Sequence, residues 1–381
     1  MKRVLILGST GSIGTQALEV IEASDELRAV GLAAGRGWET TVAQARAHGV
    51  GTIALADPDA AARAAMAWDG TVLCGEEGVR ELIAATEPDL VLNGIVGAAG
   101  LGSTVAALSA GIDVALANKE SLVLGGELVM ALAEATGARL LPVDSEHSAL
   151  HQLIDREAPG TVERLLVTAS GGPFRGREDL SEVSVAEALD HPTWKMGGRI
   201  TIDCATLMNK GFEVIEAHHL FGVPFERIDV VVHPQSLVHS LIHLVDGSTL
   251  AHLGHPDMRV PISYALNFPE RAPVEMPRLD LAAVGALTFE APDPDTFACL
   301  RLALEAGEAG GTAPTVLNAA DEVAVAAFLD GAIPFTGIAA VIERILEQMP
   351  ARPVTHFDDL FATDAEARER AAAAARELTP A

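Results

Sequence analysis

Short runs of aliphatic and β-branched residues alternate with longer alanine-rich segments through residues 1–144, and this alternation constrains the fold more than any other feature. Each run is apolar along its whole length, which is typical of strands in a parallel sheet that is buried on both faces. The alanine-rich segments between them are long enough for the crossover helices that parallel strands require. We therefore expect an α/β fold. The strand-like runs are Val4–Leu7, Ala29–Leu32, Thr52–Leu55, Leu90–Leu92, Val114–Ala117 and Leu140–Val143.

The pattern changes after residue 144 and indicates further domains. Residues 145–267 crowd strand-like runs around a helix expected at roughly 206–220, which is typical of an α+β domain with an open sheet. Closely spaced prolines predict a linker over 268–295. Residues 296–381 predict a helical domain, because apolar residues between Ile338 and Met349 follow helical spacing. The strand-like runs of the second region are Leu165–Thr168, Asp229–His233, Leu237–Leu244 and Thr249–Leu253.

Composition limits the partners and the compartment. The chain has 26 Lys and Arg against 53 Asp and Glu, a formal net charge of −27, which disfavours nucleic acid and anionic membranes as partners. Its 3 cysteines lie far apart and make neither a disulfide framework nor a paired zinc motif. The most apolar stretch, 89–118, is interrupted by polar residues and is no membrane span. We expect a cytoplasmic protein.

A glycine-rich turn follows the first predicted strand. Gly8, Gly11 and Gly14 stand between that strand and a helix expected from Ser12, and such a turn lets backbone N–H groups approach a pyrophosphate. After the second strand, where an NAD enzyme usually has an acidic residue, the chain has Ala33-Ala34-Gly35-Arg36. A guanidinium suits a 2′-phosphate, so NADPH is favoured over NADH. The alternative is that Arg36 is a solvated loop cation.

Carboxylates follow the sixth predicted strand, beyond the carboxyl edge of the sheet where α/β proteins bind ligands. Asp144 and Glu146 share a face if the segment is extended, so both could bind one ion, with Glu213 as a third oxygen ligand from a helix. All-oxygen ligation suits Mg²⁺ or Mn²⁺ rather than zinc. On spacing alone, an Asp-x-Glu pair is also a common surface feature.

Further motifs suggest a phosphate site and a lid. Asn209 and Lys210 lie one helical turn before Glu213, and Ser170-Gly171-Gly172 is an anion-friendly turn that is often only a turn. The segment His191–Gly197 places Trp194 beside Met196 and a glycine pair, which suits a closing lid; a surface loop pinned by one aromatic residue is the alternative. The chain has no GxxxxGK[ST] loop, and His239 and His243 lack the Glu of a zinc protease.

Taken together, these motifs resemble the 1-deoxy-D-xylulose 5-phosphate reductoisomerase family, and the resemblance runs along nearly the whole chain. One such block is weak support, but this many in order are specific. The matching blocks are Leu7–Gly14, Ala117–Ser121, Pro142–His147, Ser170–Arg175, His191–Gly197, Ala205–Gly211, His233–Ser236 and Asn318–Ala324.

The resemblance implies an NADPH domain (1–144), a catalytic domain with metal site and lid (145–267), the linker, a C-terminal helical bundle (296–381) and a homodimer. It implies rearrangement and NADPH-dependent reduction of 1-deoxy-D-xylulose 5-phosphate to 2-C-methyl-D-erythritol 4-phosphate, with Mg²⁺ or Mn²⁺, in the non-mevalonate isoprenoid pathway. The implied catalytic residues are Lys119, Glu146, Glu213 and His191. The implied metal ligands are Asp144, Glu146 and Glu213. The implied NADPH contacts, with Arg36 added from the argument above, are Thr10, Gly11, Ser12, Ile13, Gly35, Arg36, Asn118, Glu120 and Gly197. The implied substrate contacts are Lys119, Ser145, Glu146, Ser170, His191, Trp194, Met196, Asn209, Lys210 and Glu213.

The chain departs from the family pattern at two places, and other functions compete with the implied one. Cys204 stands where the family usually has Ser, which puts one phosphate contact in doubt because a thiol is a weaker donor. Arg36-Gly37 stands where a Lys-Asn pair is common. The runner-up function is another NADPH-dependent oxidoreductase of a small phosphorylated carbonyl compound, which would not need the three carboxylates. A non-catalytic NADPH-sensing protein would not need Lys119 with them either.

Overall fold

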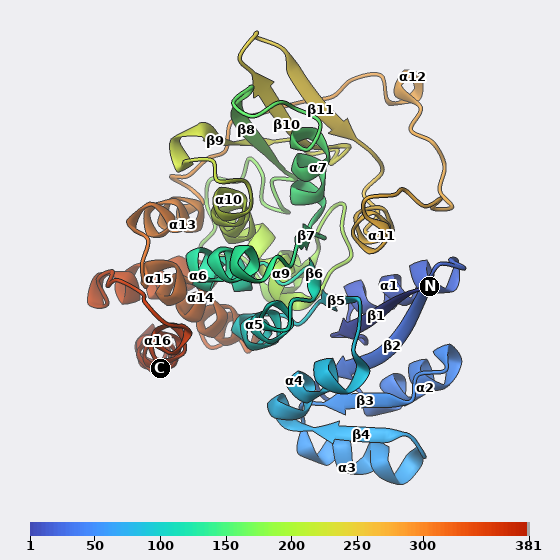
Figure 1. Ribbon diagram of the computed structural model, residues 1–381. Helices are drawn as coiled ribbons and strands as arrows, with labels where there is room; N and C mark the ends of the chain where they lie inside the picture. The colour runs from blue at the N-terminus through green and yellow to red at the C-terminus, as the bar shows by residue number, and fades with distance from the viewer. Residues whose placement is uncertain (379–381) are drawn as a thin grey trace. The chain divides into compact units, whose positions relative to one another are not determined.

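The computed structural model describes residues 1–378, and within them the chain forms two compact units, whose elements are drawn in Figure 1. Unit 1 contains Met1–Ser121, Val129–Ser148 and Asp257–Pro277. Unit 2 contains Leu122–Leu128, Ala149–Pro256 and the chain from Arg278 onward. Among residues 1–378, none of the helices combines the length and the hydropathy needed to cross a bilayer.

Unit 1 is built on a parallel sheet with the strand order β4-β3-β2-β1-β5-β6-β7, which confirms the predicted α/β fold with a Rossmann-like parallel sheet. The order reverses between β1 and β5, so ligand-binding loops are expected beyond the carboxyl ends of these strands. The strands are β1 (Lys2–Leu7), β2 (Leu27–Ala34), β3 (Thr52–Leu55), β4 (Thr71–Cys74), β5 (Leu90–Asn93), β6 (Asp113–Leu116) and β7 (Leu140–Pro142). Sequence reasoning missed β4, so its sixth strand is β7.

Helices cover both faces of this sheet. Val4 and Ile6 of β1 face a core shared with α1, α2, α3 and α11, whereas Leu5 faces α4, close to Leu82. Helix α11 comes from residues far along the chain, yet Ile262 and Leu266 are fully buried in the unit 1 core. The helices are α1 (Ser12–Glu22), α2 (Trp38–His48), α3 (Pro58–Ala67), α4 (Gly75–Thr86), α5 (Leu101–Ser109), α6 (Glu120–Thr136) and α11 (Arg259–Asn267).

Unit 2 has its own sheet, with the order β11-β10-β8-β9, in which β8 is antiparallel to β10 and parallel to β9. Its core joins the sheet to α7 and α10 through Leu150, Val214 and Ile242, all fully buried. Helix α7 begins in unit 1 and continues into unit 2. The elements are α7 (Ser145–Ile154), β8 (Val162–Ala169), α10 (Met208–Phe221), β9 (Ile228–Val232), β10 (Val238–Leu244) and β11 (Thr249–Leu253).

The rest of unit 2 is mainly helical, as predicted after residue 296. The buried helix α14 packs against α13, α15, α16 and α9. The proline-rich segment 268–295 is irregular apart from the short α12. Sequence reasoning did not predict α9, which opens on the glycine pair Gly197-Gly198. These helices are α8 (Val185–Leu189), α9 (Gly198–Ala205), α12 (Leu281–Val284), α13 (Ala298–Ala309), α14 (Ala313–Leu329), α15 (Phe335–Gln348) and α16 (Phe357–Leu378).

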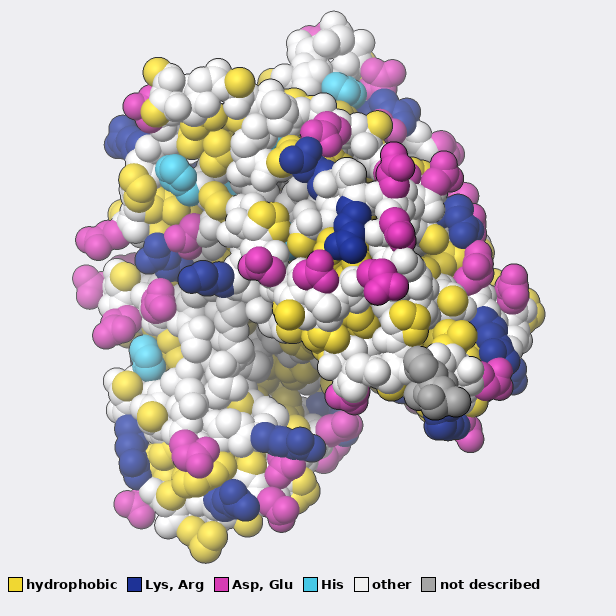
Figure 2. Space-filling model, turned by 180° about the vertical axis from the view of Figure 1, so that it is seen from behind, with side chains coloured by type: hydrophobic (Ala, Val, Ile, Leu, Met, Phe, Trp, Pro, Cys, Tyr) yellow, Lys and Arg dark blue, Asp and Glu magenta, His cyan; other side chains and the backbone are white. Residues whose placement is uncertain are grey.

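Acidic side chains dominate the charge of the chain, with 53 Asp and Glu against 26 Lys and Arg. On the face drawn in Figure 2 they are spread over the surface, with Lys and Arg side chains between them. A bound anion therefore has to be held by local N–H groups and cations that act against the overall field.

Candidate functional site

The glycine-rich turn joins β1 to α1. Gly8 has φ +83°, and a Cβ there would lie 2.6 Å from the Gly94 carbonyl oxygen. A Cβ on Gly14 would lie 2.3 Å from the Gly8 carbonyl oxygen, so neither position accepts a side chain. Gly11 stands at the N-cap of α1 and has no side chain with which to cap the first N–H groups of the helix. The exposed start of α1 at Gly11 and Ser12 can therefore bind a phosphate.

Arg36 lies at the carboxyl end of β2, directly after Gly35, and its side chain is 90% exposed. Its Nε lies 3.2 Å from Oδ2 of Asp57, whose side chain also accepts a hydrogen bond from the N–H of Ala60 at the start of α3. Asp57 thus holds the exposed guanidinium near the carboxyl end of the sheet through a single ion pair. Sequence reasoning did not include Asp57, although an Asp directly before Pro58 is a helix N-cap signal.

Asn118 and Glu120 are buried after β6 and hold the loop that follows β5. The Asn118 side-chain amide donates to the carbonyl groups of Ile95 and Gly97 and to the Glu120 carboxylate. Glu120 also accepts from the N–H of Gly97. These two residues therefore shape the loop at the carboxyl edge of the sheet. Gly197, from the same predicted set, lies in unit 2 as the N-cap of α9.

Lys119 and Asp144 meet at this edge because they follow neighbouring parallel strands. Leu116 of β6 pairs with Pro142 of β7, and the Lys119 Nζ lies 2.5 Å from Asp144 Oδ2. Burial raises the pKa of the Asp144 carboxyl, but the Lys119 ammonium and His147 outweigh that effect and hold the pKa well below its usual range. Asp144 is thus kept ionised.

Asp144 and Glu146 are not in an extended segment, so that part of the sequence argument is wrong. Asp144 starts α7: its carbonyl accepts from the N–H of Ser148 at 2.8 Å, and its Oδ1 accepts from the N–H of Glu146 at 3.1 Å. Glu146 lies in the first helical turn, and its carboxylate accepts a 2.8 Å bond from the Ser145 hydroxyl. The capping geometry, rather than strand alternation, brings the two carboxylates together.

Glu213 is buried on α10 among the residues predicted with it. The Asn209 amide donates to its Oε1 at 2.6 Å, and the Lys210 ammonium contacts its Oε2. These residues are neighbours because positions three and four apart lie on one face of a helix. One helical turn of α10 therefore carries an amide, an ammonium and a carboxylate.

The three predicted metal ligands stand on two helices: Asp144 and Glu146 at the start of α7, and Glu213 on α10. One ligand atom each of Asp144, Glu146 and Glu213 lies within 4.8 Å of the others. Leu150 of α7 and Val214 of α10 belong to one hydrophobic core of unit 2. The donor set is three carboxylates, which suits a hard divalent cation such as Mg²⁺ or Mn²⁺ and fits no zinc-type thiolate site.

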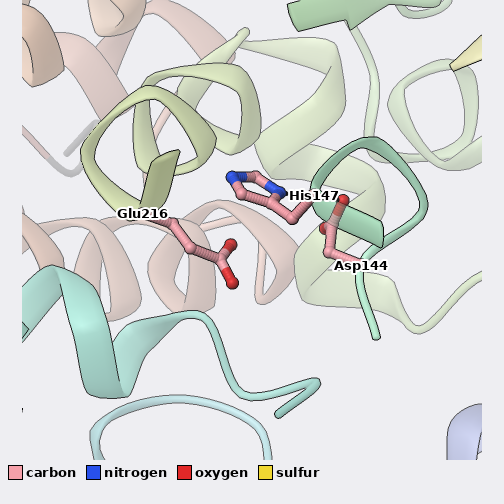
Figure 3. A group of neighbouring side chains, drawn as sticks. All are labelled: Asp144, His147 and Glu216. Atoms are coloured by element: carbon pink, nitrogen blue, oxygen red, sulfur yellow. Dashed lines mark ion pairs between the residues drawn. The ribbon is translucent and has the colours of Figure 1, made fainter. Parts of the chain in front are cut away.

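A second group shares Asp144, and Figure 3 shows its members. His147 Nδ1 lies 3.4 Å from Asp144 Oδ1, and one ligand atom each of Asp144, His147 and Glu216 lies within 4.8 Å of the others (Figure 3). Both His147 and Glu216 are fully buried. Sequence reasoning gave neither a role; the signal was their spacing, three residues after Asp144 and three after Glu213.

Ser170 and His191 form a polar pair in unit 2. The Nδ1 of His191 accepts hydrogen bonds from the N–H groups of Thr193 and Trp194, at 3.2 and 3.0 Å. Its Nε2 must then carry the proton of the neutral ring and donate it to Ser170 Oγ, 3.0 Å away. Burial lowers the pKa of His191, which favours this neutral form. The Ser170 hydroxyl hydrogen is left to donate to a further acceptor.

Trp194 and Met196 are half-buried in the segment before α9, and Gly197 is exposed. The turn after Ser170 packs on the other end of α9: a Cβ on Gly172 would lie 2.7 Å from the carbonyl oxygen of Cys204. Cys204 is thus part of the turn's packing surface, whatever its thiol contacts.

Family models match the chain in three consecutive stretches. Residues 4–126 match the model described as 1-deoxy-D-xylulose 5-phosphate reductoisomerase. Residues 140–221 match the C-terminal domain model of that name, and residues 253–370 match the model described as DXP reductoisomerase C-terminal domain.

Curated relatives match over nearly their full length. The chain is 51% identical to the 1-deoxy-D-xylulose 5-phosphate reductoisomerase of Symbiobacterium thermophilum, over 97% of this chain and 98% of that protein. It is 50% identical to the protein of the same name from Geobacillus kaustophilus, again over 97% and 98% of the two chains.

Solved structures agree with these relatives. The chain is similar to the 1-deoxy-D-xylulose 5-phosphate reductoisomerase of Zymomonas mobilis in complex with NADPH, with TM-score 0.92, 40% identity and coverage of 99% and 100% of the two chains. A DOX-P reductoisomerase in complex with NADPH, fosmidomycin and magnesium also gives TM-score 0.92 and 40% identity, with 99% coverage of both chains.

Proposed function

We propose the residue roles below from one premise: this chain belongs to the 1-deoxy-D-xylulose 5-phosphate reductoisomerase family. It catalyses the NADPH- and divalent-metal-dependent conversion of 1-deoxy-D-xylulose 5-phosphate to 2-C-methyl-D-erythritol 4-phosphate in isoprenoid synthesis. The observation that supports the residue roles is the meeting of Asp144, Glu146 and Glu213 in a chain that matches this family over nearly its whole length.

Asp144, Glu146 and Glu213 would hold the Mg²⁺ or Mn²⁺ ion. When bound, this cation supplies a Lewis acid next to the oxygens of the ketose. The protein prepares the ligands beforehand: Lys119 keeps Asp144 ionised, and the start of α7 fixes Asp144 against Glu146. Lys119 also brings a positive charge to the place where negative charge develops on substrate oxygen.

Ser170, Asn209 and Lys210 would hold the phosphate group of the substrate. The Ser170 hydroxyl is oriented by His191, which leaves its hydrogen free to point at a phosphate oxygen. Asn209 and Lys210 share a helical turn with Glu213, so α10 couples the phosphate position to the metal position. A fixed phosphate places the reacting carbons relative to both cofactors.

His191, Trp194 and Met196 would cover the substrate, together with Ser145 at the start of α7. His191 anchors the segment because its ring accepts from the backbone of Thr193 and Trp194 while it binds Ser170. The half-buried Trp194 and Met196 offer apolar surface that excludes water from a reactive aldehyde intermediate.

NADPH would bind at the carboxyl edge of the unit 1 sheet. The uncapped start of α1 offers its N–H groups to the pyrophosphate, and the exposed Arg36 offers a cation to the 2′-phosphate. Asn118 and Glu120 would act by holding the Ile95–Gly97 loop. The remaining contacts proposed by resemblance are Thr10, Ile13, Gly35 and Gly197.

The direct test is oxidation of NADPH with 1-deoxy-D-xylulose 5-phosphate, with and without a chelator. We expect turnover that the chelator abolishes and that Mg²⁺ or Mn²⁺ restores. Asp144→Asn should lose turnover by orders of magnitude while NADPH binding changes little, and Asp155→Asn at the exposed end of α7 should behave like the parent. Equal loss of turnover and NADPH binding in Asp144→Asn would mean that the carboxylate supports the fold instead.

Three further properties rest on family resemblance. We propose a homodimer, a cytoplasmic location and the division of labour among residues 1–144, 145–267 and 296–381, joined by the 268–295 linker. Light scattering of the purified protein tests the dimer, and a mass equal to one chain at working concentration would contradict it. Fractionation of the source cells tests the location, and limited proteolysis tests the linker.

A further inference from the structure

Helix α9 links two parts of the proposed substrate site. Its first residue follows Gly197, which ends the His191–Gly197 segment. Its last turn supports the Ser170 turn, because the Cys204 carbonyl oxygen lies against Gly172. The chain then turns at Leu207, which has φ +61°, and enters α10 with Asn209 and Lys210. The position of α9 therefore determines where the His191–Gly197 segment ends and where the phosphate-binding residues Asn209 and Lys210 lie.

Arg199, in the first turn of α9, binds α14 through its guanidinium group. Its Nη2 donates to Asn318 Oδ1 at 2.9 Å and lies 3.3 Å from Asp321 Oδ2. Its Nη1 lies 3.0 Å from Glu322 Oε1, and its Nε lies 3.6 Å from Asp203 on its own helix. The side chain is only 15% exposed, so these contacts are largely screened from water.

The contacts extend to α16 through a second arginine. Arg368 donates to Glu322 of α14 at 2.8 Å and to Asp364 of α16 at 2.7 Å, so both of these acceptors lie outside α9. Apolar packing usually stabilises a helix contact as well as a buried ionic cluster does. A planar guanidinium that binds several acceptors adds a fixed orientation, which apolar side chains do not provide.

We propose that Arg199 is a positioning residue that fixes the first turn of α9 on α14. In this position α9 lets the His191–Gly197 segment close over the substrate and aligns the side chains that bind the substrate phosphate. This inference rests on the proposed function of the segment. It differs from a purely structural role in what it predicts. If the cluster is only structural, breaking either the Arg199 contacts or the Arg368 contacts lowers stability and leaves substrate binding alone. If Arg199 positions α9, breaking the Arg199 contacts also weakens substrate binding, whereas breaking the Arg368 contacts does not.

Arg368→Met is the matched control, because it removes a half-buried guanidinium from the same cluster without touching α9. We expect Arg199→Met to raise the KM for 1-deoxy-D-xylulose 5-phosphate about tenfold, a factor equal to about 1.4 kcal/mol, and to change kcat by less than about threefold. Arg199→Lys should fall between Arg199→Met and the parent. Arg368→Met should lower the thermal midpoint and leave KM within about twofold of the parent.

Hydrogen exchange of residues 191–207 gives a second readout that does not depend on turnover. Exchange there should speed up in Arg199→Met and not in Arg368→Met. If Arg199→Met does not fold, Arg199→Met with Asp321→Asn removes one buried carboxylate together with its partner and should show the same KM and exchange pattern. Equal KM values in Arg199→Met and Arg368→Met, or unchanged exchange in Arg199→Met, would overturn the inference. A parent without NADPH oxidation would instead overturn the proposed function, while the exchange comparison still tests Arg199.

Discussion

Glu213→Gln tests both the proposed role of Glu213 in metal binding and its contribution to the stability of the fold. In the structure, Glu213 is buried and receives the Asn209 amide at 2.6 Å and the Lys210 ammonium. Breaking a buried ion pair by removing one partner costs about 3–5 kcal/mol. A glutamine carbonyl can still accept one of these bonds, and the loss of a charge relieves the repulsion with Glu146. We therefore expect the free energy of unfolding of metal-free unit 2 to fall by about 2 kcal/mol.

The effect on metal binding should be larger in the assay. Changing a residue that merely supports a ligand weakens metal binding by about 10–100-fold, so the loss of a ligand itself should reach at least about 100-fold. With Mn²⁺ at about 100 times the parent Kd, the metal stabilises the parent by about 2.7 kcal/mol. Under the same conditions Glu213→Gln should gain only about 0.4 kcal/mol.

Thermal unfolding with and without Mn²⁺, together with calorimetric titration of Mn²⁺ and NADPH, measures both effects. Glu226→Gln makes the same chemical change at an exposed position and serves as the control. The control should keep the Mn²⁺ stabilisation, and both variants should bind NADPH like the parent. Parent-like Mn²⁺ stabilisation in Glu213→Gln would refute the assignment of Glu213 as a ligand.

Further predictions concern the cofactor, the packing and the pH dependence. Arg36→Asp should weaken NADPH binding at least about tenfold and leave NADH binding unchanged or stronger, because a carboxylate repels the 2′-phosphate; unchanged NADPH affinity in a fluorescence titration would count against the role of Arg36. Gly126→Ala should destabilise unit 2 by about 1–3 kcal/mol, because its Cβ would lie 2.1 Å from the His219 ring. Gly102→Ala in α5, where the nearest atom is the flexible end of Arg80 at 3.4 Å, should be neutral or stabilising, and His219→Ala should suppress the Gly126→Ala defect; denaturant titrations in which the two glycine variants behave alike would contradict this. Burial raises the pKa of Asp321 to about 6 from 3.8, and Arg199 only partly offsets this. A raised pKa in the folded state gives stability that is complete below about pH 4 and lost as the pH rises through about 6. Asp321→Asn should flatten this part of the thermal midpoint profile, and a profile equal to that of the parent would contradict the assignment.

The sequence predicted the unit 1 sheet because its central strands are apolar on both faces, as Val4 to Leu7 are. It missed β4, an edge strand of four residues whose apolar run is short and whose terminal residues Thr71 and Cys74 are exposed. It also missed α9, which opens on Gly197-Gly198, a pair that indicates a turn rather than a helix start.

The carboxylate cluster was predicted on a local argument that was partly wrong. Asp144 and Glu146 were expected to share a strand face, but a helix cap brings them together. The Asp144 side chain accepts from the N–H of Glu146, and one ligand atom of each carboxylate lies within 4.8 Å of the other, so the two carboxylates meet although the predicted backbone was wrong. The contact of Asn209 and Lys210 with Glu213 was predictable because helical periodicity sets it.

Contacts between residues far apart in the chain could not be predicted from local sequence patterns. No local pattern tells that Ile262 of α11 returns to the unit 1 core or that Arg199 binds Asn318, 119 residues away. The Asn318–Ala324 block stood out only through family resemblance, with no role attached to it. Its role in packing becomes visible when α14 is placed against α9.

An anomalous difference map from crystals grown with Mn²⁺ would locate the cation directly. We expect one strong peak with oxygen ligands from Asp144, Glu146 and Glu213 at about 2.1 Å, the distance typical of a small hard cation. A peak held instead by His147 and Glu216, or no peak near Glu213 at a saturating metal concentration, would contradict it.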